Sequence, residues 1–147
     1  MKLTTRMRYG TRVMLELALH HEQGALSLGE IVHRQQLPER YVEALLGSLR
    51  GATLVQSVRG AAGGYLLGRP PGQITLYEVF EVLEGSEAFV PCTLDNSACD
   101  RRDFCVTQEV WARMYEQAMD VLRHTTLADL MQRTRDKAEA GAASYAI

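Results

Sequence analysis

The stretch Ser27–Gly51 reads SLGEIVHRQQLPERYVEALLGSLRG and contains two helical patterns that nearly touch. The first begins with a capping box, because the Ser27 hydroxyl can accept a bond from the Glu30 amide while the Glu30 carboxylate accepts one from the Ser27 amide. This box predicts a helix over residues 28–35. The apolar residues that this helix is expected to bury are Leu28, Ile31 and Val32.

The second helical pattern follows directly after Gln36 and Leu37. Pro38 fits the first position of a helix, and Gly51 is predicted to lie just past the helix end. The residues that form its apolar stripe are Tyr41, Val42, Leu45, Leu46 and Leu49. Two short helices joined this tightly are typical of a helix-turn-helix, although any antiparallel helical pair has the same pattern.

The flanking residues extend this pattern to that of a winged helix-turn-helix. Upstream, Thr4 or Thr5 is predicted to cap a helix that runs to about His21. Its apolar positions are Met7, Val13, Met14, Leu17 and Ala18. Downstream, two short β patterns within residues 54–67 surround a glycine-rich turn and predict a hairpin. Three helices followed by a hairpin is the order of a winged helix-turn-helix, in which the hairpin is the wing.

The rest of the chain predicts further helices and one long loop. A capping box at Thr75 and Glu78 begins a helix that stops at Gly85. The residues that it is expected to bury are Leu76, Val79, Phe80, Val82 and Leu83. Residues 86–104 have no periodicity and are predicted to form a loop, which in a compact chain needs a reason such as a bound metal centre.

A long helical pattern resumes at Cys105, with Trp111 beside it, and restarts near Thr126 after a kink. Its apolar positions are Val106, Val110, Met114, Ala118, Val121 and Leu122. The final helix is predicted to end near Ala138, and the residues after it are expected to be loose. The predicted fold is therefore mainly helical with a small β-hairpin. The predicted divisions are a winged domain over 1–70, a connector helix and cysteine loop over 71–104, two helices over 105–138, and a tail over 139–147.

The charge is distributed unevenly along the 147 residues, although the net charge is only −2. Residues 1–70 carry nine Lys/Arg against five Asp/Glu, a net +4, whereas the remainder carries seven against thirteen, a net −6. The basic half is suited to a nucleic-acid partner. No apolar run approaches the roughly 18 residues that span a bilayer, and the N-terminus lacks a signal-peptide pattern. We therefore expect a cytoplasmic protein without a membrane partner.

The candidate DNA-binding residues lie on the second helix of the helix-turn-helix and on the wing. The polar face of that helix carries Glu39, Arg40, Glu43, Ser48 and Arg50, and the first helix adds Arg6, Arg8 and Arg12. Arginine can pair with guanine and glutamate can accept a bond from cytosine. A solvated face is the alternative for any single helix. In the wing, Arg59 is expected to enter a minor groove, and the glycines of the wing would let the backbone approach phosphates closely. A net charge of +4 over residues 1–70 is modest for a surface that contacts phosphates, and it suits a dimer better than a monomer.

The three cysteines, Cys92, Cys99 and Cys105, lie within one 14-residue window. Three thiolates at this spacing are close enough to converge on one centre, and iron–sulfur clusters take cysteine ligands. Structural zinc remains an alternative, although it usually shows closer cysteine pairs and a fourth Cys or His. Three unrelated buried cysteines are a further alternative. A thiol enzyme is disfavoured because there is no Cys-x-x-Cys and no visible catalytic base, so we expect the protein not to be an enzyme.

Several of these residues together resemble the IscR-type regulators, also called the Rrf-two family. The similarity covers about residues 1–135 and is most specific in the wing and the cysteine loop. The matching segments are Thr4, Arg8–Tyr9, the Ser27 capping box, Tyr41–Glu43, Leu54–Gly60 and Gly63–Leu67. The resemblance implies a homodimeric winged-helix transcription factor that dimerises through its long C-terminal helix. It also implies that an iron–sulfur cluster, 2Fe-2S or 4Fe-4S, controls binding to a double-stranded DNA operator.

By this resemblance, Cys92, Cys99 and Cys105 match the cluster ligands, while Glu43 and Arg59 match base-reading positions. The full set of implied or inferred DNA-binding residues is Arg8, Tyr9, Glu39, Arg40, Tyr41, Glu43, Arg50, Ser57, Arg59, Gly60, Gly63 and Gly64. The chain departs from the family at its fourth ligand, because Gln108 stands where the IscR pattern has histidine, and Arg8 stands where related nitric-oxide sensors have a carboxylate. The candidates for the fourth ligand are Gln108, Asp95, Asp100, Asp103, His124, a small molecule or no group at all.

The function expected from the sequence is that of a transcription regulator whose cluster senses redox state, nitric oxide or cluster supply. The alternative is a regulator of the same fold whose cysteines act by thiol oxidation or bind zinc.

Overall fold

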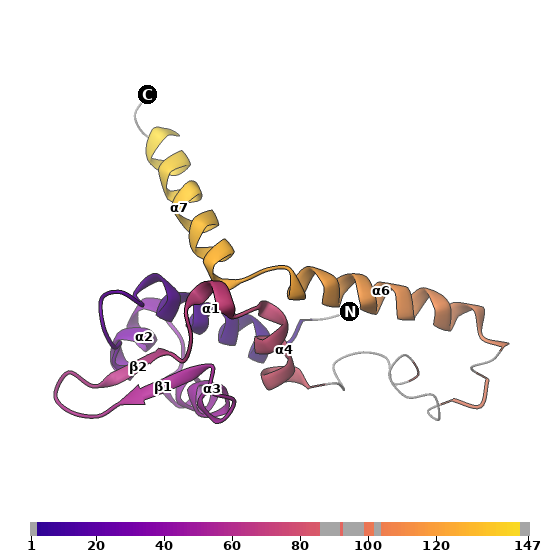
Figure 1. Ribbon diagram of the computed structural model, residues 1–147, viewed down its shortest axis with the longest axis horizontal. Coiled ribbons are helices and arrows are strands. Elements are labelled where there is room, and N and C mark those ends of the chain that lie inside the picture. The colour runs from indigo at the N-terminus through magenta and orange to yellow at the C-terminus, as the bar shows by residue number, and fades with distance from the viewer. Residues whose placement is uncertain (1–2, 86–91, 93–98, 102–103, 145–147) are drawn as a thin grey trace.

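The computed structural model describes residues 3–85, 92, 99–101 and 104–144. The elements are α1 (Thr5–Leu19), α2 (Leu28–Gln35), α3 (Glu39–Gly51), β1 (Val55–Val58), β2 (Gly64–Leu67), the 3-10 turn η1 (Pro71–Gln73), α4 (Leu76–Glu84), α6 (Val106–Arg123) and α7 (Leu127–Ser144). Four helices and the hairpin form one body, from which α6 and α7 project in different directions (Figure 1). The mainly helical fold with a hairpin wing is confirmed.

Local side-chain caps define the helix starts of the winged body. The Thr4 hydroxyl accepts a bond from the Met7 amide, so Thr4 rather than Thr5 caps α1. The capping box of Ser27 and Glu30 is present at the start of α2, with the Ser27 amide 2.8 Å from Glu30 Oε2. These caps satisfy backbone amides that have no partner inside the helix, which is why so short a pattern fixes a helix start.

The turn between α2 and α3 is tight, as a helix-turn-helix requires. Gln36 adopts the left-handed conformation with φ 52°, which ends α2 and redirects the chain toward α3. Two details differ from the sequence prediction. Pro38 is the N-cap of α3 rather than its first helical residue, and Gly51 is the last helical residue rather than one past the end.

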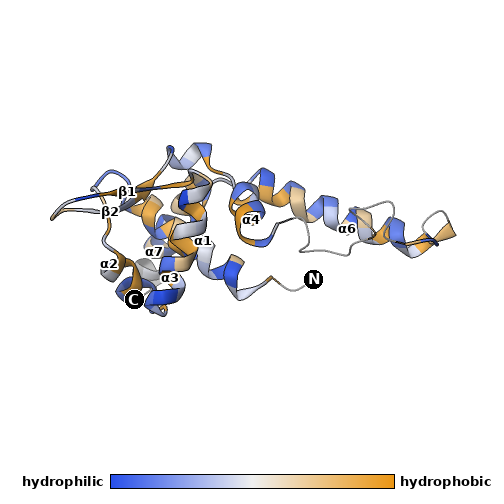
Figure 2. Ribbon diagram, turned by 90° about the horizontal axis from the view of Figure 1, so that it is seen from below, coloured by the Kyte–Doolittle hydropathy of each residue, from blue (hydrophilic) through white to orange (hydrophobic). Residues whose placement is uncertain are grey.

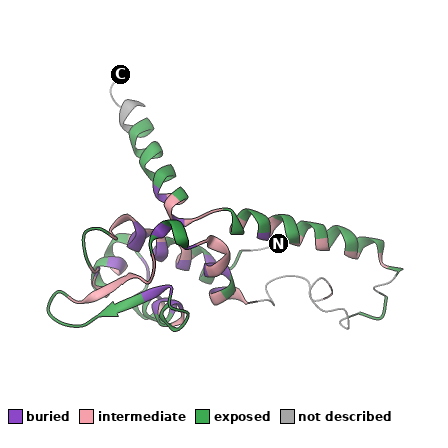
Figure 3. Ribbon diagram, viewed as in Figure 1, coloured by how far each residue is buried: buried purple, intermediate pink, exposed green. Residues whose placement is uncertain are grey.

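One hydrophobic core joins the winged body to the bases of the C-terminal helices. The fully buried side chains include Met14, Ile31, Leu46, Leu49, Ile74, Val79, Met119 and Leu127. Met119 belongs to α6 and Leu127 to α7, so both helices contribute to the core only near their junction. Beyond that junction the two helices are largely exposed (Figure 3).

The wing is an antiparallel hairpin that is also attached to the chain before α2. In its register Val55 pairs with Leu67 and Val58 with Gly64. Leu26 forms a further bridge to Tyr65, with N–O distances of 2.7 and 3.0 Å. The sequence pattern did not predict this bridge. It fixes the wing relative to the helix-turn-helix through backbone bonds rather than side chains.

The α6–α7 region agrees with the predicted kink but not with the predicted end. The kink is confirmed at residues 124–126, and the Thr126 hydroxyl caps α7 by accepting a bond from the Asp129 amide. Helix α7 continues to Ser144, so the end predicted near Ala138 is wrong, and the part of the predicted loose tail up to residue 144 is helical. Most of the predicted loop over 86–104 lies outside the described residues. No described helix is long and apolar enough to cross a membrane.

Candidate DNA-binding surface and cysteine segment

The solvent-facing side of α3 carries most of the candidate base-reading residues. Glu39, Arg40, Glu43 and Arg50 are all exposed, whereas the Tyr41 ring is half-buried. Tyr41 packs edge-to-face on Tyr9 of α1, with ring centroids 5.9 Å apart and planes at 89°. This geometry is favourable for aromatic pairs. Tyr9 and Tyr41 therefore hold α1 against α3, while the charged residues of α3 remain free to meet DNA.

The arginines of α1 have different surroundings. Arg6 donates to the Ser48 hydroxyl of α3 at 3.0 Å. Arg8 is exposed, with its guanidinium carbon 5.9 Å from the Tyr9 ring centroid. Arg12 donates to the side chain of Gln35 at 3.1 Å and also to its backbone carbonyl, so it connects α1 to the end of α2. Arg6 therefore connects α1 to α3 and Arg12 connects α1 to α2, whereas the Arg8 guanidinium lies near a ring of its own helix.

A polar network centred on the buried side chain of Glu16 links α1 to α2, and no feature of the sequence pattern predicts it. Glu16 is only 8% exposed, and its carboxylate accepts a bond from the Gln35 amide at 2.6 Å and one from Arg34 at 3.4 Å. Arg34 also donates to Nε2 of His20 at 2.6 Å, so His20 carries its proton on Nδ1, which faces the Glu16 carbonyl at 3.0 Å. The helix-turn-helix is thus fixed on α1 by polar bonds as well as by apolar packing.

Replacing Glu16 by alanine is expected to lower the free energy of unfolding by about 1–3 kcal/mol, because the bonds that its buried, charged carboxylate accepts from Gln35 and Arg34 are lost. Glu22→Ala is the matched control, since that side chain is 86% exposed, and it is expected to change stability by less than about 0.5 kcal/mol. Chemical denaturation followed by circular dichroism compares the two. Equal midpoints for both variants would show that the network does not stabilise the fold.

The wing tip exposes two of its candidate DNA-binding side chains, Ser57 and Arg59. Gly60 has φ 112°, a backbone conformation that residues with a side chain rarely adopt. No heavy atom lies within 4 Å of the position that an added Cβ would take. Gly63 and Gly64 are different. A Cβ added at Gly63 would lie 2.4 Å from the Val58 carbonyl oxygen, and one added at Gly64 would lie 2.2 Å from the Leu26 carbonyl oxygen. The folded wing therefore requires glycine at both positions, independently of any contact that they make with a DNA phosphate.

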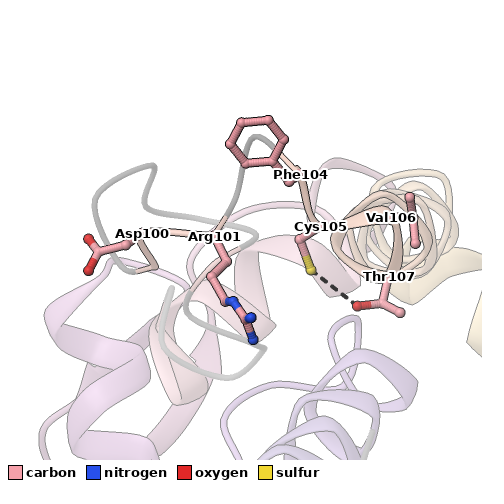
Figure 4. A pocket seen from close by; sticks show the side chains of 6 residues that line it. All are labelled: Asp100, Arg101, Phe104, Cys105, Val106 and Thr107. Carbon is pink, nitrogen blue, oxygen red and sulfur yellow. Dashed lines mark hydrogen bonds between the residues drawn. The ribbon is translucent and has the colours of Figure 1, made fainter.

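The described cysteines differ in exposure. Cys92 and Cys105 are half-buried, and Cys99 is exposed. Cys105 is the N-cap of α6, and its sulfur lies 3.2 Å from the Thr107 hydroxyl (Figure 4). The hydrogen bond from Thr107 lowers the pKa of the Cys105 thiol, helped by the Gln108 amide and by the charge of Arg101. A thiol at a helix N-terminus near a cation favours the thiolate form, which is the form that binds metals.

Gln108 links the first and third cysteines, because its side-chain amide donates to the Cys92 carbonyl at 3.3 Å and its backbone amide bonds the Cys105 carbonyl at 3.1 Å. Cys105 also lines an open hollow of about 460 Å³. Among the described residues, however, no three His, Cys, Asp or Glu side chains are grouped closely enough to hold a metal ion. Asp95 and Asp103 lie outside the described residues, and His124 bonds the Asp120 carbonyl at the far end of α6.

Comparison with known proteins gives the same picture as the fold. The family described as "Iron-dependent Transcriptional regulator" (Rrf2) matches residues 3–133. The chain is a member of the Rrf2 family. Its sequence is 41% identical over 140 residues to the transcriptional regulator CymR of Bacillus subtilis, covering 95% of this chain and 96% of that protein. It is 36% identical over 132 residues to IscR of Xenorhabdus nematophila, covering 90% and 80%.

Solved structures of this family superpose well on the chain. The structure of B. subtilis CymR, described as the global cysteine regulator, has a TM-score of 0.78 at 38% identity and covers 90% of this chain and 98% of its own. The structure of T. potens IscR has a TM-score of 0.77 at 38% identity and covers 91% and 88%. This Rrf2 protein is therefore a transcriptional regulator with a DNA-binding winged helix. Its similarity extends to both CymR and IscR.

Proposed function

We propose that this Rrf2 protein is a homodimer that binds a double-stranded operator and responds to an iron–sulfur cluster held by Cys92, Cys99 and Cys105. The observation that supports this proposal best is the long helix α6. One end of it adjoins the winged body, the other end carries Cys105, and an apolar face lies exposed between them. A single helix of this kind can connect a sensor, a dimer interface and a DNA-binding domain.

The dimer proposal rests on the apolar face of α6, which is formed by Val106, Val110, Met114 and Val121, with Trp111 at its edge. These side chains are between 41% and 74% exposed. Spacings of four, four and seven residues place Val106, Val110, Met114 and Val121 on one side of the helix, and Figure 2 shows hydrophobic segments recurring along α6. A large exposed apolar stripe is unfavourable in water and marks an interaction surface. A second copy of α6 would cover the stripe with a matching one, as a two-fold dimer interface does.

The DNA proposal places α3 in the major groove, with its exposed Arg40, Glu43 and Arg50 toward the bases. The wing would lie alongside, with Ser57 and Arg59 toward the minor groove. Arg8 on α1 would contact the backbone. In a two-fold dimer the two helix-turn-helix units meet half-sites about one helical turn, or a multiple of it, apart. The operator is therefore expected to be roughly palindromic, and the protein would act in the cytoplasm.

The cluster proposal rests on the chemistry of the donors. Three thiols, one of them with a lowered pKa, suit the iron–sulfur centres that cysteine ligates. Gln108 lies in the first turn of α6, next to Cys105, and is the first candidate for the fourth ligand of the cluster. When bound, the cluster would supply a redox- and ligand-sensitive group. Cys92, Cys99 and Cys105 would hold it, and Gln108 would keep the Cys92 backbone close to the start of α6.

Thiol oxidation without a metal is the second candidate, and one observation favours it. The lowered pKa of Cys105 and the open hollow beside it would also make the thiol reactive. Zinc is the other metal alternative. Metal and sulfide analysis of anaerobically purified protein, together with a thiol count, distinguishes the three. Selecting bound sequences from a random DNA pool, with and without chelator, then tests whether metal controls operator binding.

Replacing Arg59 by alanine is expected to weaken binding to the selected operator by about 1–3 kcal/mol, because a contact to base edges is lost. Binding to random DNA should change much less. Arg135→Ala is the matched control, since Arg135 is exposed on α7 and carries the same charge. Titrations of both variants on operator and random duplexes at one salt concentration measure the difference. An unchanged ratio between the two duplexes would contradict a base-reading role for Arg59.

A further inference from the structure

The last residue of α6 is held on α4 by an aromatic and charged contact. The guanidinium carbon of Arg123 lies 4.7 Å from the centroid of the Tyr77 ring. This is within the range of a cation–π interaction. The Tyr77 hydroxyl donates to Glu81 Oε1 at 2.6 Å, and a hydrogen bond with the same hydroxyl raises the pKa of Arg123. The carboxylate of Glu116, which is also on α6, lies 3.6 Å from Arg123 Nη1.

These groups form what we call the α4–α6 latch, defined as Tyr77, Glu81 and Arg123. In the latch the hydroxyl of Tyr77 connects a cation on α6 to a carboxylate on α4. Arg123 is 42% exposed, so solvent screens the attraction and the latch contributes little to folding stability. Its geometry is nevertheless specific, because a ring face, a hydroxyl and a planar guanidinium have to be aligned together. The latch is thus better suited to fixing an orientation than to holding the fold together.

Further contacts between α6 and the winged body also lie near its C-terminal end, whereas the Gln108 bond at its other end joins α6 to Cys92 and not to that body. The Leu76 amide donates to the Thr125 carbonyl at 2.8 Å, and Thr75 and Thr126 form a backbone bridge. Met119 is the one residue of α6 in the buried core. Toward the other end the helix runs away from the body (Figure 1), and Val110 and Val106 are 53% and 74% exposed. Helix α6 is therefore a lever whose direction is set at its base.

The length of the lever makes small angles matter. Helix α6 has 18 residues and so extends about 27 Å. A rotation of about 10° at the base moves the far end by roughly 5 Å, which is more than the 3.4 Å rise of one base pair. In a dimer formed along α6, the same rotation changes the separation of the two winged bodies. A contact that fixes this angle would therefore select the distance between two DNA half-sites.

We propose that the α4–α6 latch is a specificity-determining contact: Arg123, held by Tyr77 and Glu81, sets the spacing between operator half-sites that the dimer accepts. This inference rests on the proposed dimer and its operator. Arg123 touches no DNA in this arrangement, so it acts as a positioning residue. Loss of the latch should broaden the spacing preference without removing the affinity of each winged body for its half-site.

The test measures affinity for operators whose half-sites are moved one base pair closer, left unchanged, or moved one base pair apart. The wild type is expected to prefer one spacing by at least about tenfold, a modest part of the specificity that such interfaces reach. Arg123→Ala and Tyr77→Leu are expected to reduce that preference to less than about threefold. Affinity for a single half-site should stay within about twofold of the wild type. Tyr77→Phe keeps the ring under the guanidinium but removes the hydroxyl, so its preference should lie between those of the wild type and Tyr77→Leu.

Arg135→Ala is the control for loss of a cation, and sedimentation and circular dichroism confirm that each variant is folded and dimeric. If Arg123→Ala and Tyr77→Leu keep the spacing preference of the wild type, the latch inference is overturned while the proposed function stands. If Tyr77→Phe loses as much preference as Tyr77→Leu, the role assigned to the ring is overturned. A wild type that is monomeric, or that binds all spacings equally, overturns the proposed dimer on its operator and the latch with it.

Discussion

Replacing Val110 and Met114 together by glutamate is expected to convert the protein to a monomer and to weaken operator binding by about 100-fold or more. In a dimer formed along α6 the two carboxylates of each chain would be buried against an apolar seam, and an unpaired buried charge is strongly unfavourable. The operator effect follows because a dimer binds its second half-site intramolecularly, a gain of about 10²–10⁴ in avidity. Sedimentation equilibrium gives the mass, and fluorescence titration gives the operator affinity.

Arg133→Glu is the matched control, because it lowers the charge of the chain by the same two units on an exposed position of α7. It is expected to leave the protein dimeric and to reduce operator affinity only slightly. Affinity for a single half-site separates the two effects, since the double variant should bind one half-site as the wild type does. A double variant that sediments as a dimer would show that this face of α6 is not the interface.

The helix starts of this protein could be predicted from the sequence because the signals that make them are short-range. The boxes at Ser27 and Thr75 are closed by the glutamate three residues on, so their geometry is fully contained in four consecutive residues. The hairpin was equally local, with strands separated by a tight glycine-rich turn. Three helices followed by a hairpin is the order of elements in a winged helix-turn-helix, and that order is what the sequence predicts.

The helix ends were predicted less evenly than the starts. Gly85 follows the end of α4 as predicted, whereas the ends of α3 and α7 differ from the prediction. Gly51 was expected to terminate α3, but the chain reverses two residues later at Thr53, which takes the left-handed conformation with φ 61°. Helix α7 was expected to end near Ala138. The residues that follow include several alanines, which favour helix even without packing, and the helix continues to Ser144.

Contacts between distant residues were not predictable from the sequence. Glu16 is one of five acids in the basic half, yet it accepts bonds from residues 18 and 19 positions away. No periodicity shows that a buried carboxylate on α1 will meet α2. The latch joins residues further apart still, Tyr77 and Arg123. The cysteine window was visible at once, but whether the three thiols converge depends on chain geometry that spacing does not give.

Serine replacement of any one of Cys92, Cys99 and Cys105 is expected to remove nearly all iron and acid-labile sulfide from anaerobically purified protein. The reason is that iron in these clusters takes thiolate ligands, and a serine hydroxyl is a much weaker and harder ligand. The loss should be accompanied by loss of the visible absorption of the cluster. Gln108→Ala is the informative comparison, because it removes an amide and no thiol. It is expected to retain the cluster but to lose it faster in air, since the first and third cysteines are no longer linked.

The same variants decide between the cluster and the other uses of the cysteines. If the wild type contains iron and sulfide and the serine variants do not, a change in operator affinity between them assigns control of DNA binding to the cluster. If the wild type contains zinc instead, the structural-metal alternative holds. A wild type that stays colourless and free of iron after anaerobic reconstitution, and whose operator binding changes only when its thiols are oxidised, would contradict the cluster. Cys105, whose pKa is already lowered by Thr107, would then be the thiol to follow first.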